Sequence, residues 1–104
     1  MGTRVTRRTL ATMAMAPSTR KNYVHGLRLF RQWWGTDKRH LPTTREFEDF
    51  MLEAVEKGTQ FGDVNAVHSA LVHEHVVVTG DAREMRTGRI FRMLKGYRNA
   101  SMAT

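Results

Sequence analysis

The stretch APSTRKNYVHGLRLFRQWW, residues Ala16–Trp34, decides the fold that the sequence predicts. Apolar side chains recur along it with the i, i+4, i+7, i+11 spacing of one helix face. They are Tyr23, Leu27, Phe30 and Trp34. Pro17 ends the segment before it and Ser18 is a favourable N-cap, so we expect a helix that begins at Ser18 and stops at Gly35. Cations fill the first turns of this helix, where its dipole is already positive, and that placement is unfavourable unless this end meets an anion.

Signals for further helices stand on both sides of this stretch. Residues 1–16 predict an N-terminal arm or a short helix that begins at about Arg7. On the other side, Thr43-x-x-Glu46 is a capping box and Gly58 is a C-terminal stop, which together predict a third helix. Its apolar residues form one stripe, namely Phe47, Phe50, Met51, Ala54 and Val55.

Two more helices are expected in the second half of the chain. Asp63 is a favourable N-cap, and Gly80 would end the helix that follows it. The apolar face of that helix consists of Val64, Val67, Leu71, His75 and Val78. Residues 83–98 predict a strongly basic fifth helix, with Gly88 as an alternative start. Residues 99–104 are expected to be a disordered tail.

The predicted fold class is all-α, a compact bundle of four to five helices within residues 17–98. A length of 104 residues suits one domain with one hydrophobic core. No apolar run approaches the length of a membrane span, and there is no cysteine for a disulfide. We therefore expect an intracellular protein that does not bind a membrane.

The net charge of +7 is segregated along the chain. Residues 1–45 carry ten Lys or Arg against one acid, residues 46–82 carry one against eight, and residues 83–104 carry six against one. If the two basic ends meet in space, they form the cationic surface expected of a protein that binds a polyanion such as nucleic acid. The alternative is that these charges only keep the surface solvated.

The sequence carries none of the motifs that would indicate an enzyme. A glycine-rich phosphate loop, HExxH and GxSxG are absent, and Tyr23 and Tyr97 lie on apolar faces without a base, so we expect both in the core. On a helix, His68 and His75 share a face and His73 points elsewhere, which is awkward for a shared zinc ion. We expect ordinary surface or capping roles for these histidines, with His75 partly buried and hydrogen-bonded. No catalytic residue, metal, cofactor or small-molecule substrate is predicted.

Four stretches, taken in order, resemble the N-terminal core-binding, SAM-like domain of tyrosine recombinases, the phage integrase family. APSTRKNYVHGLRLFRQWW resembles the family's helix with Ser/Thr-Thr-Arg/Lys-x-x-Tyr followed by Phe-x-x-Trp. LPTTREFEDFM and SALVHEH are similar to its Pro-x-Thr helix and its Ser-Ala-Ile-x-x-x-His helix, and RIFRMLKGYR is similar to its closing helix. The resemblance covers about residues 10–98.

This resemblance implies sequence-directed binding of duplex DNA, as the core-binding half of a clamp around the recombination site. In the family the catalytic residues belong to a second domain, so this chain is expected to bind DNA and not to cut it. The expected contacts are the start of the Ser18 helix, the start of the Asp63 helix and the basic end of the last helix. Their candidate DNA-binding residues are Ser18, Thr19, Arg20, Lys21, Asn22, His25, Asn65, Arg92, Lys95 and Arg98.

Asp63 departs from the family's pattern, because an acid at the start of this helix repels phosphate. Asn65 beside it could still read adenine. A second function stays open, that of a small helical adaptor or dimerisation module whose acidic third helix meets a basic neighbour. Copies of the chain could also associate on DNA. Binding of single-stranded DNA or RNA ranks third, because the sequence lacks a ladder of exposed aromatic residues.

Overall fold

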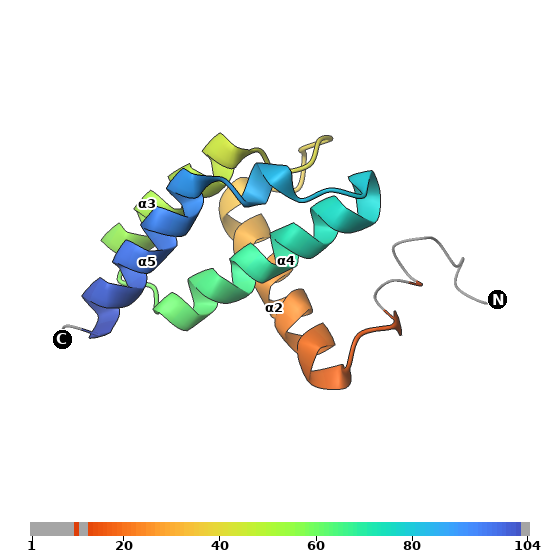
Figure 1. The fold of residues 1–104 in the computed structure, drawn as a ribbon, viewed down its shortest axis with the longest axis horizontal. Coiled ribbons are helices and arrows are strands. Elements are labelled where there is room, and N and C mark those ends of the chain that lie inside the picture. The colour runs from red at the N-terminus through yellow and green to blue at the C-terminus, as the bar shows by residue number, and fades with distance from the viewer. Residues whose placement is uncertain (1–9, 11–12, 103–104) are drawn as a thin grey trace.

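In the computed structural model, which describes residue 10 and residues 13–102, four α-helices follow one another along the chain (Figure 1). They are α2 (Pro17–Trp34), α3 (Thr44–Glu56), α4 (Phe61–Thr79) and α5 (Gly88–Met102), with a short 3-10 turn, η1 (Arg83–Met85), between the last two. The described part of the chain contains no strand. The predicted all-α class is confirmed, whereas the first expected helix lies largely outside the described residues.

Two of the expected helix starts are displaced. Helix α2 begins at Pro17 with Ala16 as its N-cap, because proline needs no N–H partner in the first turn and its fixed φ suits this position. Ser18 therefore lies inside the first turn. Helix α4 begins at Phe61 with Gln60 as its N-cap, and neither of these two N-cap residues makes a side-chain capping bond.

The start of α3 agrees with the prediction. The Glu46 N–H donates to the Thr43 hydroxyl at 3.2 Å, and the Thr43 N–H donates to the Glu46 carboxylate at 3.0 Å. The capping box is therefore complete. At the other end, the chain turns through Gly58 with φ of 71°, a left-handed conformation that favours glycine.

Helix α5 begins at Gly88, the alternative start that the sequence predicts, and ends later than expected. The Thr87 hydroxyl accepts from the Ile90 N–H at 3.1 Å, which satisfies a donor of the first turn and fixes the start at Gly88. The helix continues to Met102, so the predicted tail is wrong for residues 99–102. Their sequence, NASM, contains no proline or glycine that would stop the helix.

Helix α4 lies at the centre of the fold and contacts α2, α3, η1 and α5 (Figure 1). It is consequently buried over a wide arc. The core combines the interior faces of all four helices, namely Phe30, Phe47, Phe50, Met51, Ala54, Val64, Val67, Leu71, Met85, Ile90 and Leu94. Two residues assigned to these faces are outside the core: Val55 is 58% exposed and Val78 is 52% exposed. Each lies near the end of its helix, beyond the packed centre.

A helix needs about 20 predominantly apolar residues to span a bilayer. None of the described helices is both long enough and apolar enough to cross a membrane.

Candidate nucleic-acid interface

The first turns of α2 present half of the predicted contacts to solvent. These exposed residues are Ser18, Thr19, Arg20, Lys21 and Asn22. The guanidinium of Arg20 turns back toward the preceding segment, where Nη2 donates to the Met13 carbonyl at 3.3 Å and to the Met15 carbonyl at 3.5 Å. Arg20 therefore both carries charge and holds the segment that leads into α2. Lys21 makes no ion pair with the described residues, so its ammonium is available to an external anion.

His25 and Asp63 join α2 to the start of α4. His25 Nε2 lies 3.0 Å from Asp63 Oδ1, and the two side chains are 46% and 41% exposed. His25 was predicted to contact DNA. In the structure its Nε2 atom instead pairs with the Asp63 carboxylate. The expected N-cap role of Asp63 is wrong, because α4 begins at Phe61 with Gln60 as its N-cap and Asp63 lies inside the first turn. Asn65, two residues further on, is exposed.

A hollow of about 490 Å³ lies between the first half of α2 and α4, beside the contacts that join the two helices. Its polar lining includes Thr19, Asn22, His25, Asn65, Ser69 and His73. The structure therefore brings the predicted residues of α2 and α4 to one place. Ser69 and His73 were missed by sequence reasoning, because only the crossing of the two helices places them there. Among the described residues nothing bonds to the buried His73 Nε2, and burial lowers the pKa of this ring.

The predicted residues of α5 lie apart from the first turns of α2. Arg92, Lys95 and Arg98 are all exposed, and α5 contains no acid. In Figure 1 the first turns of α2 and the end of α5 lie at opposite sides of the molecule, with the start of α4 near α5. The structure thus leaves two separate basic segments, which a long ligand could contact together.

Tyr97 connects α5 to the start of α4. Its hydroxyl donates to the Thr59 carbonyl, and its ring lies 6.1 Å from that of Phe61. Partial burial, with a smaller effect of the Asp63 charge, raises the pKa of Tyr97. Tyr23 is buried, as predicted, whereas Tyr97 is half-buried and packs against the core from its edge.

The acids of α3 differ from the cations of α2 and α5 in having partners nearby. Asp49 lies 3.9 Å from Arg45, Glu53 lies 3.4 Å from Lys57, and Glu48 lies 3.9 Å from Arg89. In contrast, no described carboxylate lies within ion-pair distance of Lys21, Arg28, Arg31, Arg92, Lys95 or Arg98. Such surface pairs add little stability. Because these acids are paired with Arg45, Lys57 and Arg89, the positive charge of α2 and of most of α5 is left uncompensated.

Two further cations of α2, Arg28 and Arg31, were not among the predicted contacts. At about 100° per residue, Lys21, Arg28 and Arg31 fall within about 80° of one another around the helix. They form one exposed face, opposite the buried Tyr23 and Phe30. Their spacing of seven and three residues was the signal in the sequence that could have revealed this face.

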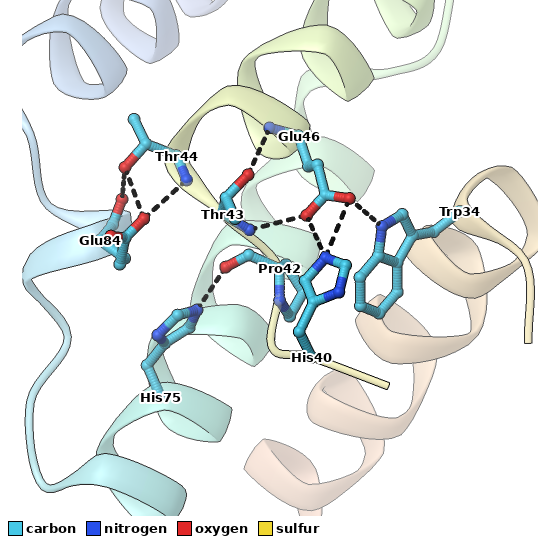
Figure 2. A network of polar contacts seen from close by, with 8 residues as sticks. All are labelled: Trp34, His40, Pro42, Thr43, Thr44, Glu46, His75 and Glu84. Carbon is cyan, nitrogen blue, oxygen red and sulfur yellow. Dashed lines mark hydrogen bonds and ion pairs between the residues drawn. The ribbon is translucent and has the colours of Figure 1, made fainter. Parts of the chain in front are cut away.

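The junction between the end of α2 and the start of α3 is fixed by Glu46 (Figure 2). The Glu46 carboxylate accepts from Trp34 Nε1 at 2.7 Å and from His40 Nε2 at 3.1 Å, in addition to the Thr43 N–H. Partial burial opposes ionisation, but these hydrogen bonds outweigh it and lower the pKa of Glu46 to about 2. The loop from Gly35 to Thr43 is therefore anchored at both ends.

The buried histidines serve the fold. His75 Nε2 bonds to the Pro42 carbonyl at 2.7 Å, so the prediction of a buried, hydrogen-bonded role is confirmed (Figure 2). His68 is also buried and bonds to the Met85 carbonyl at 2.7 Å, so the prediction of a surface or capping residue is wrong for it. Within the described residues, no three His, Asp or Glu side chains are grouped so that they could hold a metal ion.

Comparisons of this chain with protein-family models, with curated proteins and with solved structures found no match.

Proposed function

We propose that this chain binds duplex DNA through the first turns of α2, the start of α4 and the outer face of α5. The observation that carries the proposal is the uneven pairing of charges. Helices α2 and α5 each contain four Lys or Arg and no acid, whereas most acids of α3 have a cation or another polar partner beside them. Uncompensated cations on exposed helix faces favour a polyanion, since phosphate contacts release counterions.

The side chains that line the hollow between α2 and α4 support binding to base edges in a groove of the duplex. Thr19, Asn22, Asn65 and Ser69 offer neutral donors and acceptors there, and the exposed Lys21 lies in the same turns of α2, on its outer face. Amides and hydroxyls read base edges, and lysines contact phosphates. The resemblance of the helix motifs to the core-binding domain of tyrosine recombinases agrees with this arrangement. We propose that the chain positions DNA in such a recombinase, while strand cleavage belongs to residues outside this chain.

The experiment measures binding of a fluorescein-labelled duplex by anisotropy over a series of salt concentrations. The slope of log K against log salt should be steep, at about −0.9 for each phosphate contacted. In the variant Lys21→Gln, Lys95→Gln, Arg98→Gln, affinity should fall about 10- to 100-fold, and the slope should become shallower by two to three.

The matched control is Arg45→Gln, Lys57→Gln, Arg83→Gln. It also removes three positive charges, but each of these cations already pairs with an acid. We expect the control to bind within about threefold of the parent chain. A parent chain that ignores duplex DNA at low salt, or binds it with no salt dependence, would contradict the proposal.

A second function, protein interaction, is favoured by one observation on α3. Leu52 and Val55 are each 58% exposed among the acids of this helix. Such an acidic and partly apolar face could meet a basic neighbour. Light scattering after gel filtration, with and without duplex DNA, separates the two functions. An adaptor should self-associate or capture protein without DNA, whereas a DNA-binding module should change size when duplex is added.

A further inference from the structure

We propose that the outer face of α2 and the loop after it form a second phosphate-binding surface, made by Arg28, Arg31, Lys38 and Arg39. This surface would contact the backbone of the same duplex, at a distance from the hollow between α2 and α4. The inference rests on the proposed function and extends it, because none of these four residues belongs to the predicted contacts.

The first observation is continuity of charge. Arg28 and Arg31 are exposed, and they continue the face that Lys21 begins near the helix start. Helix α2 ends at Trp34, and the exposed Lys38 and Arg39 follow in the loop. At 1.5 Å per residue the 18 residues of α2 span about 27 Å, which is less than one turn of duplex DNA at about 34 Å. One duplex can therefore meet both ends of the helix.

The second observation is a hollow at the end of α2. It has a volume of about 490 Å³, and Arg31, Lys38 and Arg39 contribute to its lining. Two segments of the chain, the last turns of α2 and the following loop, thus direct their cations to one place. The lining also includes the apolar Leu27 and Val78, along which the stems of long basic side chains can lie.

Two acids lie close to this surface. Glu74 lines the hollow, but it is only 4% exposed and its carboxyl accepts a hydrogen bond from the Tyr23 hydroxyl. Asp37 is exposed in the loop itself. Against these, the backbone N–H groups of residues 36–40 donate to no other atom of the described chain. Backbone donors of exposed loop residues, beside three cations, suit phosphate oxygens.

The third observation is that the loop is held before any ligand binds. Glu46 bonds to Trp34 on one side of the loop and to His40 and Thr43 on the other (Figure 2). His75 holds the adjacent Pro42 carbonyl. Because Lys38 and Arg39 are carried by an anchored loop, they lose less backbone freedom when they meet phosphate.

The test uses the variant Arg31→Gln, Lys38→Gln, Arg39→Gln and the same matched control, Arg45→Gln, Lys57→Gln, Arg83→Gln. Circular dichroism and thermal unfolding first check that both variants are folded. On duplex DNA the first variant should lose about 10-fold or more in affinity, and its salt slope should become shallower by two to three. The control should stay within about threefold of the parent chain.

A second measurement needs no substitution. Lysines are acetylated briefly in the free protein and in its DNA complex, and the modified sites are read by mass spectrometry. Lys38 and Lys21 should be protected by DNA, whereas Lys57 should react equally in both states.

The outcomes separate the two proposals. One outcome would contradict the second surface alone. In it, the variant Lys21→Gln, Lys95→Gln, Arg98→Gln binds more weakly, the variant Arg31→Gln, Lys38→Gln, Arg39→Gln binds like the control, and Lys38 remains reactive in the complex. The second surface is then wrong and the proposed function stands. If the parent chain does not bind duplex DNA, both proposals are wrong.

Discussion

Gly26 of α2 lies against the backbone of Ala66 of α4, so closely that a Cβ on residue 26 would stand 2.3 Å from the Ala66 carbonyl oxygen. The obstacle is backbone, which cannot rotate away as a flexible side chain could. The two helices therefore cross at a distance that only glycine permits at this position. This crossing sets the hollow between α2 and α4, because the helices diverge from it.

We expect Gly26→Ala to lower the free energy of unfolding by about 3 kcal/mol, since overpacking forces α2 and α4 apart. Urea denaturation measures the change. Gly96→Ala is the control, because a Cβ there meets nothing within 4 Å, and it should stabilise α5 by about 0.5 to 1 kcal/mol. Equal effects of the two substitutions would show that the close crossing does not limit stability.

Tyr23→Phe should destabilise the protein by about 2 kcal/mol, because it removes the hydroxyl that donates to the buried carboxyl group of Glu74. Tyr97→Phe should cost about 1 kcal/mol or less, since that hydroxyl donates to a neutral carbonyl and is only half-buried. Thermal unfolding of both variants tests the order. A smaller effect for Tyr23→Phe would mean that Glu74 is satisfied without it.

Glu46→Gln should reduce stability by about 1 to 2 kcal/mol at pH 7, because the amide cannot reproduce the charged hydrogen bonds with Trp34, His40 and Thr43. The pKa of Glu46 is lowered from 4.5 to about 2 in the folded chain. Its contribution is therefore complete above pH 4.5 and is lost as the pH falls toward 2.

Denaturation of Glu46→Gln and the parent chain at several pH values checks this dependence. The difference between the two should shrink through that window. Glu53→Gln, which alters only a surface ion pair with Lys57, should change stability by less than about 0.5 kcal/mol at any pH. A difference for Glu46→Gln that does not vary with pH would contradict the role of its charge.

His68→Gln should make the free energy of unfolding fall less steeply as the pH drops below 6.5. Burial is the largest influence on this ring and lowers its pKa below 6.5, although the bond to the Met85 carbonyl acts in the opposite direction. The unfolded chain consequently takes up a proton first, and the free energy of unfolding falls as the pH drops below 6.5. His73 has a lowered pKa as well, so the double variant with His73→Gln should be flatter still. An unchanged pH profile would show that neither ring controls it.

Asp63→Asn should strengthen DNA binding by about fivefold at low salt, because it removes a negative charge from the start of α4. The asparagine can still accept a hydrogen bond from His25, 3.0 Å away in the parent chain. Asp49→Asn on α3 removes the same charge beside Arg45 and should leave binding nearly unchanged. If both substitutions act alike, the start of α4 does not face the duplex.

The helices could be predicted where the signal is local. Thr43 and Glu46 identify the start of α3 because both partners of the capping box lie within one turn. The starts of α2 and α4 could not be located in this way, because their N-cap residues, Ala16 and Gln60, make no side-chain capping bond that would mark them in place of Ser18 and Asp63. In each helix, the residue that is the better capping type, Ser18 or Asp63, lies inside the first turn and is not the N-cap.

The candidate site was less accessible to sequence reasoning than the fold. The exposure of Lys21 and Arg92 follows from helical spacing. The pairing of His25 with Asp63, and the arrival of Ser69 and His73 at the same hollow, depend on how α2 crosses α4. The residue pattern along one helix carries no information about how that helix crosses another. The crossing depends on a close contact between Gly26 and Ala66, which lie 40 positions apart in the chain.

Because α2 packs chiefly on α4, the two helices that form this central interface are not neighbours in the chain. All of α3 and both of its connecting loops must be folded back before the crossing can form. The loss of chain entropy thus precedes the gain from packing, and folding should be slower than in a helical bundle whose successive helices pair. The rate-limiting step is then expected to be closure of the segment from Gly35 to Gln60, with α3 already helical within it.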